Sequence, residues 1–168
     1  MTEAYLLLNK AMKIYSFETT QDLNISIEEA WEFMSSPANL KKITPPGMGF
    51  EITSGYAGEK MYPGQLISYI VKPLAGIPVT WLTEITHVHA PHYFVDEQRF
   101  GPYALWHHKH FLEKTANGVR MKDVVHYAIP LGFLGRMMNT LIVRKKLKEI
   151  FEFRFQTLER LFNNRKND

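Results

Sequence analysis

The chain has 168 residues, of which 45% are hydrophobic and 22% charged, a composition typical of one globular domain and not of a disordered chain. It contains no cysteine, which excludes disulfides, thiolate metal sites and cysteine nucleophiles. The net charge of +3 is a mild excess, whose local source matters more than its sum. No apolar run approaches the roughly 18 residues that a membrane-spanning helix needs.

Residues 1–11 contain a short apolar patch, but they lack the basic leading region and the small-residue cleavage site of a signal peptide. We therefore expect a cytoplasmic protein in which residues 1–11 form a loosely ordered or disordered N-terminal extension, with Met12 as an alternative start. A single domain is expected over residues 12–162, followed by a short C-terminal tail over 163–168.

The first part of the domain predicts one strand and two short helices. Residues 12–23 alternate in polarity and are rich in β-forming residues, which is typical of a strand. Ser26 and Glu29 have the spacing of a capping box, which predicts a helix over 27–35. Pro37 then begins a second short helix, which ends at a Thr-Pro-Pro-Gly sequence.

The remainder predicts a sheet and one long helix. Strands are expected near 49–54, 65–72, 78–87, 92–100, 103–114 and 119–129, with short connections that make neighbours antiparallel. Apolar residues recur at three- and four-residue steps from 133 to 162, which predicts a helix with a broad apolar face. That face must lie against the sheet. We therefore expect an α+β fold in which a curved antiparallel sheet of about seven strands surrounds a long C-terminal helix.

The most informative stretch is the predicted hairpin over residues 103–129. With Asn117 and Gly118 as a two-residue turn, His110 would lie opposite Val125 and His108 opposite Tyr127. Strand alternation then places on one face Trp106, His108, His110, Leu112, Asp123, Val125, Tyr127 and Ile129. The opposite face is more charged and should be solvated. The first face combines large apolar groups with a few polar ones, as pocket linings do.

The preceding strand extends this inner face. Phe94, Asp96, Gln98 and Phe100 share one side of it, and we place that side inward. A buried Asp96 or Asp123 would need hydrogen-bond donors, because an unpaired buried carboxylate is costly. The predicted ligand-binding residues are Trp81, Phe94, Asp96, Gln98, Phe100, Trp106, His108, His110, Asp123, Val125, Tyr127, Met138 and Leu141.

Four motifs resemble the SRPBCC superfamily of START-like, birch-pollen-allergen-like helix-grip proteins over roughly residues 12–162. They are Asn39-Leu40…Ile43-Thr44-Pro45, Phe94-Val95-Asp96-Glu97-Gln98, Gly101-Pro102-Tyr103-x-x-Trp106-x-His108-x-His110 and Asp123-x-Val125-x-Tyr127-x-x-Pro130. Within the superfamily, the chain is similar to the bacterial ligand-binding, polyketide cyclase/dehydrase-like branch. The resemblance implies a hydrophobic cavity under the C-terminal helix. It does not imply one activity, because members range from lipid and hormone carriers to aromatase/cyclases and chaperone regulators.

Three roles stay open for His108 and His110. They can be structural, hydrogen-bonded to Asp96, Asp123 and Tyr127. They can instead orient a polar group of an otherwise apolar ligand, or chelate a metal with Asp123 as a third ligand. The resemblance gives no reason to expect a metal, so we expect no metal and no cofactor.

The leading hypothesis is a binding protein for a small, largely apolar ligand of lipid, polyketide or aromatic type. The alternative is an aromatase/cyclase- or dehydratase-type enzyme, in which His108 or His110 moves a proton, Asp123 fixes the tautomer and Tyr127 donates to an oxyanion. A protein-interaction module is a third, weaker hypothesis. We expect a monomer or homodimer without integral membrane association. We expect no nucleic-acid partner, because the basic run at 144–148 lacks interleaved aromatic residues.

Overall fold

The computed structural model describes residues 13–54, 58–74 and 76–164. The predicted extension over 1–11 and most of the predicted tail lie outside these residues. The N-terminal elements are β1 (Ile14–Leu23), α2 (Ile27–Met34), α3 (Pro37–Leu40) and the 3₁₀ turn η1 (Pro46–Met48). The remaining strands are β2 (Glu51–Ile52), β3 (Gln65–Leu74), β4 (Ile77–His89), β5 (Tyr93–Phe100), β6 (Leu105–Thr115) and β7 (Gly118–Ala128).

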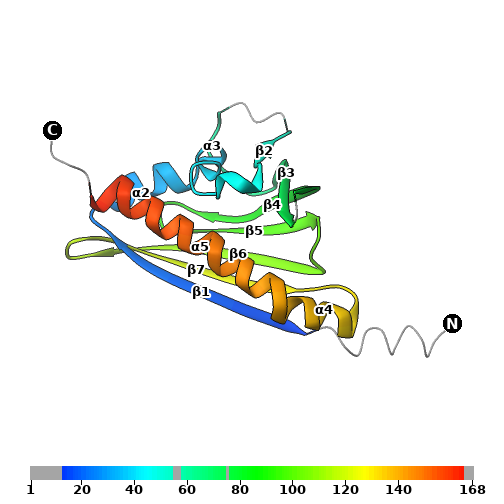
Figure 1. Ribbon diagram of the computed structural model, residues 1–168. Coiled ribbons are helices and arrows are strands. Elements are labelled where there is room, and N and C mark those ends of the chain that lie inside the picture. Colours follow the sequence, from blue (N-terminus) through cyan, green and yellow to red (C-terminus); the bar gives the residue numbers. More distant parts are fainter. Residues whose placement is uncertain (1–12, 55–57, 75, 165–168) are drawn as a thin grey trace.

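Within the described residues, seven strands form one antiparallel sheet with the order β1-β7-β6-β5-β4-β3-β2. The first strand therefore pairs with the last, and from β7 to β2 each strand pairs with the one that precedes it in the sequence. The long C-terminal helix lies across one face of this sheet, and α2 and α3 lie beside it (Figure 1). This arrangement confirms the predicted sheet around a long helix, with two short helices after the first strand.

The long helix is continuous but not uniform. It consists of α4 (Gly132–Met138), the π-helical turn η2 (Asn139–Val143), α5 (Arg144–Leu158) and a second π-helical turn η3 (Glu159–Asn163). Tyr127 Oη donates a hydrogen bond to Asn139 Oδ1 at 2.9 Å, which joins β7 to the first half of the helix. Gln21 Nε2 donates to the Phe155 carbonyl at 3.0 Å, which joins β1 to the second half. The helix is thus attached to the sheet at two distant points. None of the described helices is long and apolar enough to cross a membrane.

Helix α2 begins after Ser26, the N-cap residue of the predicted capping box. The Ser26 hydroxyl accepts a hydrogen bond from the Glu29 backbone N–H at 3.0 Å, which satisfies one of the free amides of the first turn. The buried side of α2 carries Ile27, Ala30 and Trp31. These residues pack in one core cluster with the end of the long helix, so α2 closes one end of the space between helix and sheet.

The register of the β6–β7 hairpin differs from the prediction by two residues. Thr115 pairs with Gly118, so that His110 lies opposite Asp123. A Cβ at position 118 would come within 2.2 Å of the Leu23 carbonyl oxygen, and the residue has a φ of 146°. Glycine is therefore needed at position 118 because the end of β1 comes close to it. It does not occupy a central position of the turn, as the prediction had it. Because the predicted and observed registers differ by an even number of residues, every side chain of the hairpin keeps its predicted face.

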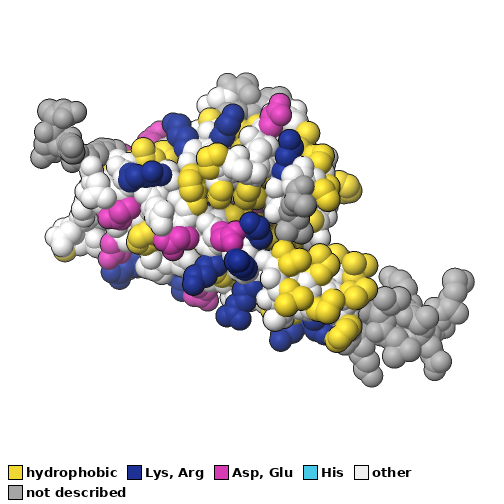
Figure 2. Space-filling model, in the orientation of Figure 1, with side chains coloured by type: hydrophobic (Ala, Val, Ile, Leu, Met, Phe, Trp, Pro, Cys, Tyr) yellow, Lys and Arg dark blue, Asp and Glu magenta, His cyan; other side chains and the backbone are white. Residues whose placement is uncertain are grey.

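The first turns of the long helix leave most of their apolar side chains in solvent. Leu134, Met137 and Leu141 are exposed, by 66% in the case of Leu141. Figure 2 shows the apolar surface that these turns form, with Lys and Arg side chains beside it. The prediction that the whole apolar face of the helix lies against the sheet is therefore wrong for these three residues, and correct for the buried Leu147 and Leu158 of α5.

Candidate functional site

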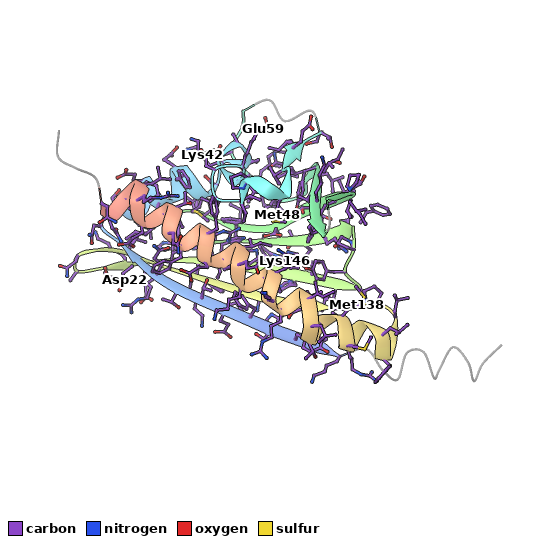
Figure 3. The ribbon with its side chains drawn as sticks, in the orientation of Figure 1. Asp22, Lys42, Met48, Glu59, Met138 and Lys146 are labelled. Carbon is purple, nitrogen blue, oxygen red and sulfur yellow. The ribbon has the colours of Figure 1, made fainter. Side chains whose placement is uncertain are left out.

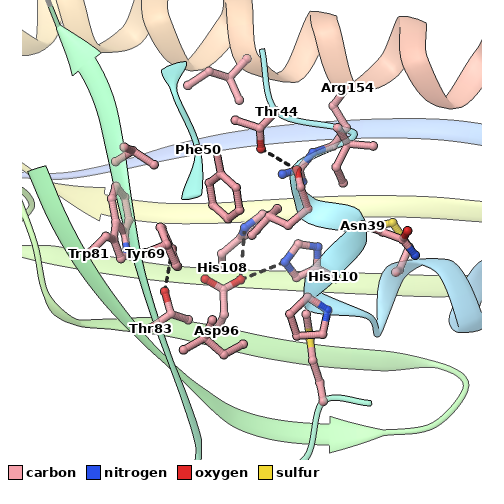
Figure 4. A pocket seen from close by; sticks show the side chains of 18 of the residues that line it. Asn39, Thr44, Phe50, Tyr69, Trp81, Thr83, Asp96, His108, His110 and Arg154 are labelled. Carbon is pink, nitrogen blue, oxygen red and sulfur yellow. Dashed lines mark hydrogen bonds and ion pairs between the residues drawn. The ribbon is translucent and has the colours of Figure 1, made fainter. Parts of the chain in front are cut away.

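A cavity of about 150 Å³ lies between the sheet and α5 (Figure 4). Its walls come from α2 and α3, from the segment over residues 43–50, from β3 to β6 and from α5. Most of the wall is apolar, and its apolar members include Leu40, Ile43, Phe50, Ile67, Val71, Trp81 and Phe151. An apolar cavity of about this volume has room for a molecule the size of benzene.

Two imidazoles and two carboxylates form a closed square at one end of the cavity. Asp96 Oδ2 lies 2.9 Å from His110 Nε2 and 3.4 Å from His108 Nδ1. On the other side of the rings, Asp123 Oδ1 lies 3.0 Å from His108 Nε2. It also lies 2.7 Å from His110 Nδ1, although this contact lacks the alignment of a hydrogen bond. Each imidazole thus bridges the same two carboxylates, and Figure 4 shows Asp96 facing both rings.

Strand register brings these four side chains together. His108 and His110 lie on the same face of β6. Asp96 of β5 pairs with His108, and Asp123 of β7 pairs with His110. The two imidazole centroids are 3.7 Å apart. Phe94 stacks on His110 with a centroid distance of 4.1 Å and an interplanar angle of 15°. Packing therefore fixes both rings before any ligand arrives.

Arg154 of α5 adds a cation to this group. Its Nη1 lies 3.6 Å from Asp123 Oδ1, and its guanidinium carbon lies 4.8 Å from the centre of the Phe151 ring. The side chain is buried, and its Nε and Nη1 have no hydrogen-bond partner among the described residues. The sequence analysis missed this residue. The available signal was its position on the same helical face as Leu147, Phe151 and Leu158.

The environment moves the pKa values of the four residues in different directions. Burial acts to raise the pKa of Asp96 and of Asp123, but the imidazoles outweigh it, and the pKa of Asp123 falls well below its usual value. Burial and the neighbouring imidazole together lower the pKa of His108. For His110 burial also acts to lower the pKa, but the two carboxylates outweigh it and raise the value. His110 is therefore the more readily protonated of the two histidines.

No family model and no curated protein matches the chain. Solved structures do match it over most of its length. Protein CV1439 from Chromobacterium violaceum superposes with a TM-score of 0.67 at 12% identity, over 88% of this chain and 97% of that one. Protein Ms6760 from Mycobacterium smegmatis gives 0.63 at 15% identity, over 90% and 96%. Ara h 8.0201 gives 0.56 at 16% identity, over 87% and 98%.

The chain has the helix-grip fold. The solved structures that it matches share this fold. At these identities the similarity establishes the architecture and no particular activity.

The helix-grip domain brings six of the predicted ligand-binding residues to the cavity wall. They are Trp81, Phe94, Asp96, Trp106, His108 and His110. Asp123, Val125 and Tyr127 are buried on the same face of the sheet but do not line this cavity. Asp123 lies behind the imidazoles, and the Tyr127 hydroxyl donates to Asn139. The expectation that Tyr127 donates to an oxyanion in the cavity is therefore wrong.

Four further predicted residues lie elsewhere. The Gln98 side-chain amide donates to the Tyr103 carbonyl at 2.7 Å, which holds the turn between β5 and β6. Phe100 is 63% exposed, because the pairing of β4 with β5 shifts after Gln98 and leaves Arg99 as an extra residue that breaks the alternation. Met138 and Leu141 lie at the α4 end of the long helix, away from the cavity; Figure 3 labels Met138 there.

Two cavity residues that the sequence analysis missed form a hydrogen bond. Tyr69 Oη and Thr83 Oγ1 are 2.7 Å apart on the neighbouring strands β3 and β4. Burial raises the pKa of the Tyr69 phenol, and the Asp96 carboxylate adds to the effect, so that this group stays protonated. Alternation within β3 was the available signal, because Ile67, Tyr69 and Val71 share its inner face.

Proposed function

We propose that this helix-grip domain binds a small, largely apolar ligand in the cavity between the sheet and α5. The supporting observation is the cavity itself, in which an apolar wall surrounds about 150 Å³ and polar side chains converge at one end. This volume favours an aromatic ring, or one ring or short chain of a larger lipid- or polyketide-like molecule. Specific binding sites commonly combine such a wall with a few fixed polar groups.

The polar end of the cavity favours a ligand that carries an oxygen acceptor. The Trp81 indole N–H is buried and has no hydrogen-bond partner among the described residues. His108 and His110 of the sheet and Arg154 of α5 add cationic or neutral donors to the cavity lining. A buried donor without a partner costs free energy, so a ligand oxygen that accepts from one of these groups would gain affinity.

The same cavity supports a finer placement in the ligand-binding, polyketide cyclase/dehydrase-like branch of the SRPBCC superfamily. The motif residues Trp106, His108 and His110 lie on its wall. The cytoplasmic location remains a prediction from the sequence.

Fluorobenzene is a suitable probe, because it matches the cavity volume and its binding is followed by ¹⁹F NMR. We expect saturable binding to the wild-type protein and its loss in Ile67→Phe, whose added ring fills the cavity from β3. Leu66→Phe is the matched control, because Leu66 is the next residue on β3 and is 54% exposed on the other face. Native mass spectrometry of protein purified without detergent would also detect a retained natural ligand.

The proposal fails if fluorobenzene does not bind the wild-type protein, or if Ile67→Phe and Leu66→Phe bind it equally well. Circular dichroism of both variants shows whether the fold is intact, since a larger core side chain can cost about 1–3 kcal/mol.

One observation favours acid–base catalysis as a second candidate function. His108 and His110 reach the cavity wall, and Asp123 behind them is placed to orient both rings. Turnover of a polyketide-like substrate that is lost in His108→Gln and His110→Gln, but kept in His107→Gln, would support it. Equal turnover in all three would exclude these histidines as the acid and base.

A further inference from the structure

We propose that Asp96, His108 and His110 bind a divalent transition-metal ion of the zinc type, with one coordination position open to the cavity. One donor atom from each residue lies within 4.8 Å of the other two. All three residues line the cavity, whereas Asp123 on the far side of the rings does not. The sequence had led us to expect no metal, and to consider Asp123 the third ligand if one were bound.

The two distances from Asp96 to the histidine nitrogens are close to those of a shared ion. A tetrahedral zinc site with bonds of 2.0–2.1 Å places its ligand atoms about 3.3 Å apart. In the structure, Asp96 Oδ2 lies 2.9 Å from His110 Nε2 and 3.4 Å from His108 Nδ1. Small rotations of these side chains would therefore complete a site with two nitrogen ligands and one oxygen ligand. This donor set suits zinc and its neighbours in the first transition row and does not suit calcium.

The protonation of the imidazoles also favours a cation between them and Asp96. A neutral imidazole carries one N–H and one lone pair. His108 Nε2 forms a hydrogen bond with Asp123 Oδ1, so the His108 ring can direct its single N–H to that side and its Nδ1 lone pair toward Asp96 Oδ2. His110 Nε2 forms its hydrogen bond with Asp96 Oδ2, and its Nδ1 has no hydrogen-bond partner among the described residues. Because a lone pair and a carboxylate oxygen repel one another, the contact between His108 Nδ1 and Asp96 Oδ2 favours a cation between them.

Asp123 has the position of the carboxylate that commonly supports metal-bound histidines. Such a carboxylate accepts the other ring N–H, fixes the tautomer and makes the metal-binding nitrogen more basic. Here a single carboxylate oxygen faces both rings, at 3.0 and 2.7 Å. Arg154 lies 3.6 Å from the same oxygen and offsets its charge. The buried side of the proposed site is thus formed by the protein before the metal arrives.

The charge balance indicates what the open position would hold. A divalent ion and Arg154 carry three positive charges, and Asp96 and Asp123 carry two negative ones, which leaves one positive charge in a buried region. An anionic oxygen on the fourth position would neutralise it. This inference about the ligand rests on the proposed function. It narrows the ligand class to small apolar molecules that carry a carboxylate or similar oxyanion.

The first experiment measures zinc binding by chelator-treated full-length protein in competition with a chromogenic chelator. Cobalt(II) serves as a spectroscopic substitute whose visible absorption reports tetrahedral coordination. We expect one ion per chain, and at least a 100-fold loss of affinity in His110→Ala and in Asp96→Asn. Asp123→Asn should lose about 10- to 100-fold, since it removes the supporting carboxylate and leaves the ligands.

His107→Ala is the matched control. His107 is the residue between the two proposed ligands on β6, and its Nδ1 lies 3.1 Å from Glu97 Oε1 on the opposite face of the sheet. Its removal should leave zinc affinity unchanged. Circular dichroism identifies variants that fail to fold. The wild-type protein gives an independent test, because zinc should raise its unfolding temperature and a chelator should reverse the rise.

A second pair of probes separates the metal from the apolar cavity. Benzoate should bind the zinc-loaded protein at least tenfold more tightly than the chelator-treated protein, whereas fluorobenzene should bind both equally. If fluorobenzene binds and zinc does not, the proposed function survives and the metal site is wrong. If zinc binds and neither probe does, the metal site survives and the proposed function is wrong. Absence of stoichiometric zinc binding by the wild-type protein, or equal losses in His107→Ala and His110→Ala, would overturn the metal site.

Discussion

Arg154 Nη1 of α5 lies 3.6 Å from Asp123 Oδ1 of β7, inside the protein. Both side chains are buried, and Asp123 is only 1% exposed. The contact joins the long helix to the sheet beside the two imidazoles of the site. A buried charge is costly in free energy unless a partner of opposite charge lies beside it. This contact therefore links the stability of the domain to the electrostatics of the candidate site.

Replacement of Arg154 by methionine should destabilise the chelator-treated protein by about 3–5 kcal/mol, because it leaves part of a buried carboxylate charge without its partner. Urea unfolding followed by circular dichroism measures the loss. Arg120→Met is the control: Arg120 pairs with Asp22 at 2.7 Å on the surface, where solvent screens the pair, and its loss should change stability little. Equal effects of the two variants would contradict the interior role of Arg154.

A double-mutant cycle between Arg154→Met and Asp123→Asn should show non-additive destabilisation. The two side chains are in contact and belong to one charge network, so we expect a coupling free energy of about 0.5–3 kcal/mol. The cycle is measured by urea unfolding of the wild type, both single variants and the double variant. Strict additivity of the two losses would indicate that Arg154 of the helix and Asp123 beside the imidazoles contribute to stability independently.

Tyr127→Phe should cost about 1–2 kcal/mol of stability and leave fluorobenzene affinity unchanged. The substitution removes the donor to the buried Asn139 Oδ1, which is left unsatisfied. Urea unfolding and ¹⁹F NMR measure the two quantities. Tyr62→Phe, at a position that is 52% exposed, should affect neither. A large loss of fluorobenzene affinity in Tyr127→Phe would mean that this hydroxyl serves the cavity after all.

Gly118→Ala should destabilise the domain by about 1–3 kcal/mol, because the new Cβ meets the Leu23 carbonyl and an alanine is strained at this positive φ. Gly47→Ala is the control, since no atom lies within 4 Å of a Cβ built there. Thermal unfolding compares the two. Similar unfolding temperatures would refute the close approach of β1 to the β6–β7 turn.

Leu147→Ala and Leu141→Ala test which part of the long helix is held by the sheet. Leu147 is 2% exposed and Leu141 is 66% exposed, although both belong to the apolar pattern of the same helix. Urea unfolding should show a loss of about 2–5 kcal/mol for Leu147→Ala. For Leu141→Ala the change should stay within about 0.5 kcal/mol. Comparable losses would mean that the Leu141 side chain also packs against the protein.

The sequence alone determined the features that depend on local periodicity. The capping pair at Ser26 and Glu29 located the start of α2. The two-residue period of strands placed His108 and His110 together on the inner face, and that result survived a hairpin register that was wrong by two residues. Residues on an unbulged stretch of strand keep their relative orientation whatever the strand pairs with, so these features needed no knowledge of the rest of the chain.

Only the tertiary structure decided which groups meet. The pairing of three strands brought Asp96 and Asp123 to opposite sides of the imidazoles, and the rotation of α5 brought Arg154 to Asp123. The extra residue in β5 turned Phe100 outward, and the position of the helix left Leu141 in solvent. Register, bulges and helix rotation result from packing between segments far apart in the chain. The periodicity within any one segment therefore does not contain them.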